Sequence, residues 1–245
     1  MIYTVRRQEY QGPLPIGNPK MTNPNTPLFS QTKFIRLLWW IVVGLVTLHL
    51  TIQAIHYYIQ EVPWLFRGLF DVDEEESFST WFSTIILFIS AMLLLLTAQL
   101  KDRKNDPFCR HWYGLALGFI LLSMDEIVGL HETLNTLTEV AWTIPGTGLV
   151  FLVFLVYLKF LLHLPQPAKK EFLIAGFLFL SGAIGVEHLS DYYVEPFGMD
   201  NFGYQLLTTL EESLEMSGVV FFIRALLRHL SADGPENTTM PYFPK

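Results

Sequence analysis

Residues 113–124 read YGLALGFILLSM, and residues 125–132, which follow directly, read DEIVGLHE. An α-helix rises about 1.5 Å per residue, so the apolar stretch alone covers only about 18 Å of a bilayer core that is roughly 30 Å thick. A helix that crosses a membrane here must continue through the acidic residues. The stretch therefore predicts a transmembrane helix that carries ionisable side chains into the hydrocarbon region.

The composition of the whole chain also favours a membrane setting. Of its 245 residues, 51% are hydrophobic and only 16% charged, and the mean hydropathy is +0.35. This balance is too apolar for an ordinary soluble domain. The net charge is −7 and the basic residues form short clusters, which excludes a nucleic-acid-binding stripe. The single cysteine, Cys109, excludes an intrachain disulfide and a zinc finger.

Apolar stretches long enough to cross a bilayer occur six times, so we expect an all-α, polytopic membrane protein with a bundle of six transmembrane helices. We expect residues 1–33 to be a disordered tail, 34–230 to be the membrane domain and 231–245 to be a second tail. The six stretches are 34–59, 81–100, 112–134, 146–164, 172–193 and 204–227.

The basic residues predict the orientation, because short cytoplasmic loops are rich in Lys and Arg. Basic residues occur at both ends of the predicted membrane domain and in every second loop, which places them on one side of the membrane. The loops on the other side contain a single basic residue, Arg67. Both termini are therefore expected in the cytoplasm. The basic residues on the predicted cytoplasmic side are Arg6, Arg7, Lys20, Lys33, Arg36, Lys101, Arg103, Lys104, Arg110, Lys169, Lys170, Arg224, Arg228 and Lys245.

Eight carboxyl groups fall inside or at the edge of the predicted hydrocarbon region. With this orientation the third and fifth stretches carry them late and the sixth carries them early, so all are expected in the outer half of the membrane. His49, Gln53 and His56 of the first stretch reach the same level. The eight are Asp125, Glu126, Glu132, Glu187, Asp191, Glu211, Glu212 and Glu215.

Helical periodicity places several of these groups on common faces. At about 100° per residue, Glu187, His188 and Asp191 share one face of the fifth stretch, and the three glutamates of the sixth stretch repeat that arrangement. Asp125 and Glu132 nearly coincide on the third stretch, while Glu126 and His131 diverge to its flanks. We therefore expect an acidic layer between facing helices.

The energetic cost of this layer indicates that something must offset it. An acidic side chain at the middle of a spanning helix costs about 2.5–3.5 kcal/mol, so eight could cost roughly 20 kcal/mol, more than the stability of most domains. Basic partners are nearly absent from the outer half. Bound cations or protonation of the acids would remove the charge.

Carboxylate and histidine at helical spacing are the ligands with which helical bundles hold iron or manganese, although a strict Glu-x-x-His pair is missing. We expect one or two divalent metals, iron or manganese preferred and zinc possible. Glu126 and Glu212 are the candidates for proton transfer or for orienting ligands. His49 is expected to be a hydrogen-bonded core residue. The expected metal ligands are Asp125, His131, Glu132, Glu187, His188, Asp191, Glu211, Glu215 and His56.

Three functions are compatible with such a layer. The first is a metal-dependent enzyme, an oxidoreductase or a hydrolase, that acts on a lipid-soluble substrate entering from the bilayer. The second is a transporter of protons or metal cations that uses the same acids as a relay. The third is an accessory subunit in which protonated acids and histidines only fix helix packing. The cytoplasmic halves of the acidic helices are almost wholly apolar, which favours a closed-ended pocket over a pore.

The acidic run at residues 71–76 resembles an incomplete calcium loop, but it lacks the central glycine and the closing glutamate. We expect a solvated loop that attracts cations to the outer mouth. Trp64, Leu65, Phe66 and Phe70 just before it are typical of a segment at the membrane interface.

Overall fold

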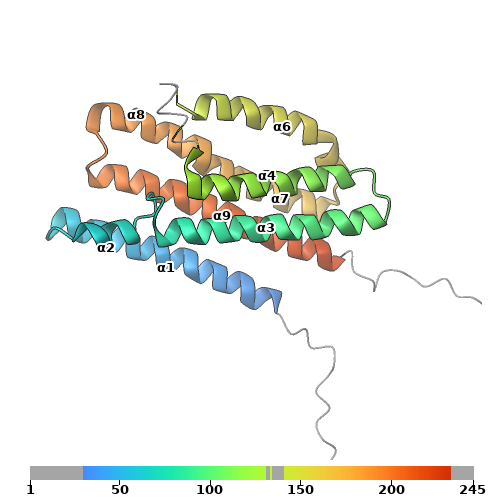
Figure 1. The fold of residues 1–245 in the computed structure, drawn as a ribbon, viewed down its shortest axis with the longest axis horizontal. Coiled ribbons are helices and arrows are strands. Elements are labelled where there is room, and N and C mark those ends of the chain that lie inside the picture. The colour runs from blue at the N-terminus through green and yellow to red at the C-terminus, as the bar shows by residue number, and fades with distance from the viewer. Residues whose placement is uncertain (1–29, 131–132, 134–140, 233–245) are drawn as a thin grey trace, which may run out of the picture. The chain divides into compact units, whose positions relative to one another are not determined.

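The computed structural model of the chain describes residues 30–130, 133 and 141–232. Every regular element among these residues is a helix, which confirms the all-α fold class (Figure 1). The elements are α1 (Gln31–Tyr58), α2 (Trp64–Leu69), α3 (Phe78–Arg103), α4 (Cys109–Val128), α6 (Thr143–His163), α7 (Gln166–Leu180), the π-helix η1 (Ser181–Val186), α8 (Glu187–Phe197) and α9 (Phe202–Ala232).

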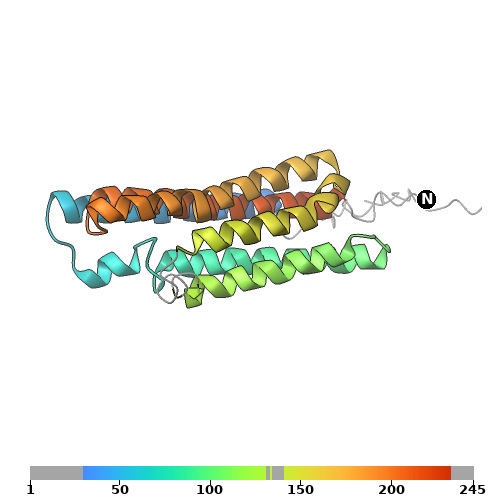
Figure 2. The same cartoon turned by 90° about the horizontal axis from the view of Figure 1, so that it is seen from above.

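Helix α9 is the element around which the others pack. It contacts α1, α3, α7, η1 and α8, while α3 and α4 lie side by side along their length (Figures 1 and 2). Gly218 allows α9 to approach α7 closely, because a Cβ there would lie 2.6 Å from the backbone nitrogen of Phe179. The absence of a side chain at Gly218 thus sets the distance between these two helices.

Two apolar clusters form the core. The first joins α3, α4, α6, α7 and α9 at the end of the bundle where α3 and α6 terminate. The second joins α1, α3 and α9. Burial of these side chains is the main favourable term in helix packing in water, whereas close packing takes that role in lipid. The fully or nearly fully buried members of the first cluster are Leu94, Ala98, Trp112, Ala116, Phe160, Leu164, Phe172, Ala175, Phe222, Ala225 and Leu226.

Four helical segments are long and apolar enough to cross a membrane: α1, α3, α6 and the continuous segment Gln166–Phe197. They coincide with four of the six stretches expected from sequence. The other two stretches correspond to α4 and α9, which, like α8, carry acidic residues of the predicted layer. Much of the apolar surface faces outward, as on α6, where Leu149, Phe151 and Leu152 are exposed. A hydrogen bond of 2.8 Å from Gln31 Nε2 to Ser231 Oγ joins the start of α1 to the end of α9.

Helix α4 ends earlier than expected. The sequence predicted one helix unbroken through Glu132, but α4 stops at Val128, and this prediction is wrong at Gly129. Gly129 has a φ of 58°, in the left-handed region that favours glycine, and its N–H donates to the carbonyl of Asp125. The carboxylate of Glu75 occupies the space that a Cβ on Gly129 would take. The α4 terminus therefore packs directly against the acidic run.

The segment between α7 and α8 is a π-helix, which the sequence did not predict. Its residue Gly182 packs against α9, since a Cβ there would lie 2.6 Å from the carbonyl oxygen of Glu211 and 2.8 Å from Cγ of Glu215. Single π-turns inside longer helices occur frequently at functional sites. Here the π-helix leads directly into Glu187, the first residue of α8.

Candidate acidic site and outer pocket

Three glutamates of α9, all half-buried, form the centre of the candidate site. The carboxyl group of Glu211 interacts electrostatically with those of Glu187, Glu215, Asp73 and Asp191. These groups come from α8, from α9 itself and from the loop between α2 and α3. The structure therefore brings together the acidic faces that helical periodicity predicted for the fifth and sixth stretches.

Glu212 links this group to α4. Its carboxyl group interacts electrostatically with Glu126 as well as with Glu211, Glu215 and Asp73. The two residues expected to transfer protons or to orient ligands are thus neighbours. We call the whole set the acidic cluster, and its members are Asp73, Glu126, Glu187, Asp191, Glu211, Glu212 and Glu215.

Contacts from α6 hold the α8 part of the cluster in place. The indole Nε1 of Trp142, just before α6, donates a hydrogen bond of 2.5 Å to Oε1 of Glu187. Thr143 Oγ1 lies 3.3 Å from Nδ1 of His188. The start of α8 is thus hydrogen-bonded to the start of α6, and the preceding η1 packs against α9 through Gly182. Contacts on two sides therefore position Glu187.

The remaining predicted ligands lie in different surroundings. His188 is on the exposed face of α8, which it shares with the cluster member Asp191, and Asp125 is half-buried near the end of α4. His131 and Glu132 lie outside the described residues. Within the part of the chain that the structure describes, no three His, Cys, Asp or Glu side chains are arranged to hold a metal ion. The predicted metal site is therefore untested and stays a prediction.

His56 lies in a pocket beside α2, which is also lined by Asp73 of the acidic cluster. Its Nδ1 accepts a hydrogen bond of 3.2 Å from the N–H of Val62, and its Nε2 lies 3.3 Å from Nη1 of Arg67. A metal ion bound to Nε2 would meet the positive guanidinium at once. The structure thus places His56 in an arginine network, in a pocket that is lined by none of the other proposed ligands among the described residues.

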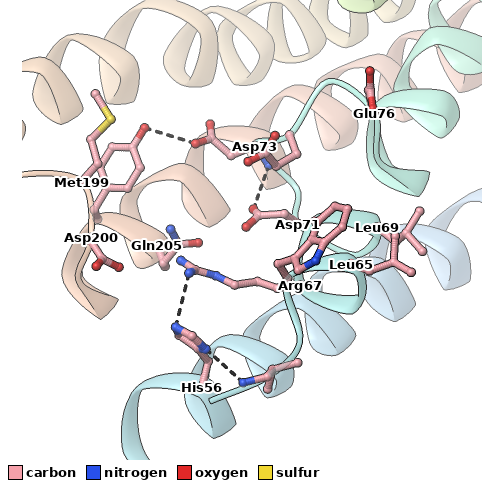
Figure 3. A pocket seen from close by; sticks show the side chains of 15 residues that line it. His56, Leu65, Arg67, Leu69, Asp71, Asp73, Glu76, Met199, Asp200 and Gln205 are labelled. Atoms are coloured by element: carbon pink, nitrogen blue, oxygen red, sulfur yellow. Dashed lines mark hydrogen bonds between the residues drawn. The ribbon is translucent and has the colours of Figure 1, made fainter. Parts of the chain in front are cut away.

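The pocket beside α2, which we call the α2 pocket, has a volume of about 570 Å³ (Figure 3). Its walls come from the end of α1, from α2, from the acidic run and from the start of α9. Figure 3 shows Arg67 extending across it toward the wall that carries Gln205. The lining residues are His56, Val62, Trp64, Leu65, Arg67, Gly68, Leu69, Asp71, Asp73, Glu74, Glu76, Met199, Asp200, Tyr204 and Gln205.

Asp71 departs from the prediction of a solvated acidic run, because it is only 6% exposed. Its Oδ2 accepts a hydrogen bond of 2.7 Å from Nε2 of Gln53, and its Oδ1 lies 3.4 Å from Nδ1 of His49. His49 is 1% exposed and accepts a hydrogen bond from the N–H of Val72, in keeping with a core histidine. A buried carboxylate needs such partners to offset its desolvation.

Arg67 is the functional candidate that sequence reasoning missed. Its Nε donates to Oε1 of Gln53 over 3.1 Å and its Nη2 donates to the hydroxyl of Tyr57 over 2.9 Å. The available signal was its position as the one basic residue in the predicted outer loops. Trp142 was missed too, and its apolar neighbours gave no sign that it would bind a carboxylate.

Comparison with protein families gives one match. The model of a family described as a domain of unknown function, DUF8692, matches residues 37–230. No curated protein and no solved structure matches the chain. The matched region spans α1 to α9 and thus includes the acidic cluster and the α2 pocket.

Proposed function

We propose that this chain, which belongs to the DUF8692 family, is an integral membrane protein that crosses the bilayer six times with both termini in the cytoplasm. The crossings would be α1, α3, α4, α6, the segment from α7 to α8, and α9. The proposal is supported by the outward-facing apolar side chains and by the contact of Gln31 with Ser231, which brings the start of α1 beside the end of α9 at one end of the bundle. It is also supported by the clusters of Lys and Arg at that end.

We further propose that the acidic cluster binds one or two divalent metal ions and serves an enzyme that acts on a lipid-soluble substrate. The observation that carries this proposal is the approach of carboxyl groups from α4, α8, α9 and the acidic run. Carboxylates this close cannot all be ionised without compensation, and a cation supplies it. Carboxylate oxygen is a donor that suits manganese and iron.

When bound, a divalent metal would supply Lewis acidity toward water or oxygen. The chain's own residues would supply the rest. Glu211, which interacts electrostatically with both Glu187 and Glu215, would hold the ion together with these two residues. The pair Glu126 and Glu212 would accept and release protons, since neighbouring carboxyl groups share a proton readily.

A transporter of protons or metal cations is the second candidate. The π-helix in the middle of the fifth crossing favours it, because interrupted helices often mark ion sites in transporters. A transport path must continue to the cytoplasm, however. The first apolar cluster, with Trp112, Phe160 and Leu226 almost fully buried, fills that end of the bundle. The closed end therefore supports the enzyme more strongly.

Elemental analysis of the protein purified in nanodiscs tests the metal proposal. We expect iron, manganese or zinc in the wild-type protein and its loss in the double variant Glu211→Gln/Glu215→Gln. Glu195→Gln, an exposed glutamate of α8 outside the acidic cluster, is the matched control and should retain the metal. Wild-type protein without metal, or a double variant with unchanged content, would refute the proposal.

Cation flux in sealed proteoliposomes separates the two candidates. An enzyme with a closed-ended site gives no flux of protons or Mn²⁺ above that of empty vesicles. Flux that disappears in the Glu211→Gln/Glu215→Gln variant and persists in Glu195→Gln would replace the enzyme with the transporter. The elemental analysis shows, for the enzyme and the transporter alike, whether the acidic cluster binds a metal ion.

A further inference from the structure

Arg67 is held in an unusual electrostatic setting within the α2 pocket. Five carboxylates line this pocket, yet Arg67 makes its contacts with the neutral acceptors Gln53 and Tyr57 and lies beside His56. Its guanidinium also lies 5.4 Å from the ring centroid of Tyr57. Among the described residues, no carboxylate forms an ion pair with it. The positive charge is thus oriented by neutral partners, and the pocket carboxylates act on it only from a distance or through Gln53 and Tyr57.

The contacts of Arg67 leave hydrogen-bond donors over. A guanidinium carries about five N–H groups, and the contacts with Gln53, His56 and Tyr57 use one on each nitrogen. Nη1 and Nη2 therefore each keep one N–H. Planar pairs of N–H groups match phosphate oxygens in geometry and charge, which is why arginine is common in phosphate sites.

The opposite wall of the pocket offers acceptors in place of donors. Gln205 is only 5% exposed, and within the described part of the chain its Oε1 has no hydrogen-bond partner. Beside it, Asp200 accepts a hydrogen bond of 2.9 Å from the Tyr57 hydroxyl and has further lone pairs to offer. A buried amide oxygen without a donor is costly, so this wall is suited to a ligand that carries N–H groups and positive charge.

The rim of the pocket is apolar and exposed. Trp64, which is 83% exposed, and Leu65, which is 50% exposed, line the pocket and belong to the short helix α2, which also carries Arg67 and the 57% exposed Phe66. Exposed Trp and Phe side chains of this kind are typical of segments at the boundary between lipid headgroups and acyl chains. The pocket would then open at the outer interface of the membrane.

We propose that the α2 pocket binds the headgroup of a zwitterionic phospholipid, with the phosphate on Arg67 and the ammonium group at the wall formed by Gln205 and Asp200. The acyl chains would remain in the bilayer along Trp64 and Leu65. The four other carboxylates that line the pocket, Asp71, Asp73, Glu74 and Glu76, add negative charge and so disfavour a lipid with net negative charge. This site rests on the membrane placement proposed above and does not depend on the metal.

Native mass spectrometry of the full-length protein, titrated with dioctanoyl lipids, tests the site. We expect phosphatidylethanolamine to bind about tenfold or more tightly than phosphatidylglycerol, because phosphatidylglycerol has a neutral glycerol in place of the ammonium group and keeps a net negative charge. Arg67→Gln should lose at least that factor for phosphatidylethanolamine. Arg103→Gln, an exposed arginine at the far end of α3, is the matched control and should bind as the wild type does.

A second variant keeps the test decisive if Arg67→Gln does not fold. Glu74→Gln/Asp200→Asn changes two exposed side chains and should remove most of the preference for the zwitterionic lipid. An unchanged preference in that variant, equal binding of phosphatidylglycerol to the wild type, or full binding by folded Arg67→Gln would each overturn the proposal. Glycerophosphoethanolamine that bound as tightly as the lipid would show a site for a soluble phosphate ester instead. Metal content should be the same in Arg67→Gln and wild type, so failure here is distinct from failure of the acidic cluster.

Discussion

Gly182 of η1 packs directly against the backbone of Glu211 in α9, so that a Cβ at this position would lie 2.6 Å from the Glu211 carbonyl oxygen. This contact brings the start of α8 to the level of the glutamates of α9. Glu187, which follows η1 directly, interacts electrostatically with Glu211 at this level. The geometry of the acidic cluster thus depends on a residue that has no side chain.

Gly182→Ala should lower stability, because a methyl group here forces two helix backbones apart. Overpacking of this kind costs about 1–3 kcal/mol, which corresponds to a loss of several degrees in the unfolding temperature. Gly185→Ala is the matched control, since nothing lies within 4 Å of a Cβ at Gly185. Thermal unfolding in detergent measures both. Equal unfolding temperatures for the two variants would show that the contact between η1 and α9 is looser than described.

Trp142→Phe should destabilise the protein through Glu187. The change removes the indole N–H that donates to Oε1 of Glu187 and leaves a half-buried carboxylate with one donor fewer. Loss of such a hydrogen bond costs about 1–3 kcal/mol. In a Glu187→Met background the same change should cost much less, because the acceptor is gone. Thermal unfolding of the four proteins completes the cycle, and additive effects would contradict the interaction.

Gly129→Ala should be unfavourable for a backbone reason. At a φ of 58° an alanine costs about 1–2 kcal/mol, and its methyl group would also displace the carboxylate of Glu75. Gly118→Ala, in the same helix and with open space at the Cβ position, should be neutral or slightly stabilising. Chemical or thermal unfolding compares them. A Gly129→Ala protein as stable as Gly118→Ala would argue against the break at the end of α4.

The proposed orientation predicts which loops are accessible from outside an intact cell. In a Cys109→Ser background, a membrane-impermeant thiol reagent should label Glu61→Cys, between α1 and α2, without lysis. It should label Asp102→Cys, at the end of α3, only after lysis. Both positions are exposed, so burial does not confound the comparison. The reverse pattern would invert the topology, and labelling of both without lysis would refute the membrane crossing of α3.

The helices could be predicted from sequence because a bilayer demands long apolar stretches, and such stretches are visible without an alignment. Four of the six expected stretches are helices that meet this demand in the structure. Helical periodicity also grouped Glu187 with Asp191, and Glu211 with Glu215, on common helix faces, and the structure brings these residues near one another. The break at Gly129 was not predicted, because a single glycine within a helical pattern is usually tolerated.

The α2 pocket was beyond sequence reasoning for a different physical reason. Asp71 is buried because it contacts Gln53 and His49 of α1, and Gln53 lies 18 residues earlier in the sequence. No local sequence pattern predicts a contact between residues so far apart. The role of Arg67 likewise depends on three residues of α1 that lie around it. The π-helix has no composition signal of its own, since the sequence SGAIGV differs little from an α-helical one.

Titration of metal-stripped protein with Mn²⁺, followed by electron paramagnetic resonance of the free ion, tests the acidic cluster most directly. The account predicts saturable binding of one or two Mn²⁺ per chain in nanodiscs, its loss in Glu211→Gln/Glu215→Gln, and its retention in Glu195→Gln. Wild-type protein that leaves all Mn²⁺ free, or a double variant that binds as much as the wild type, would contradict it.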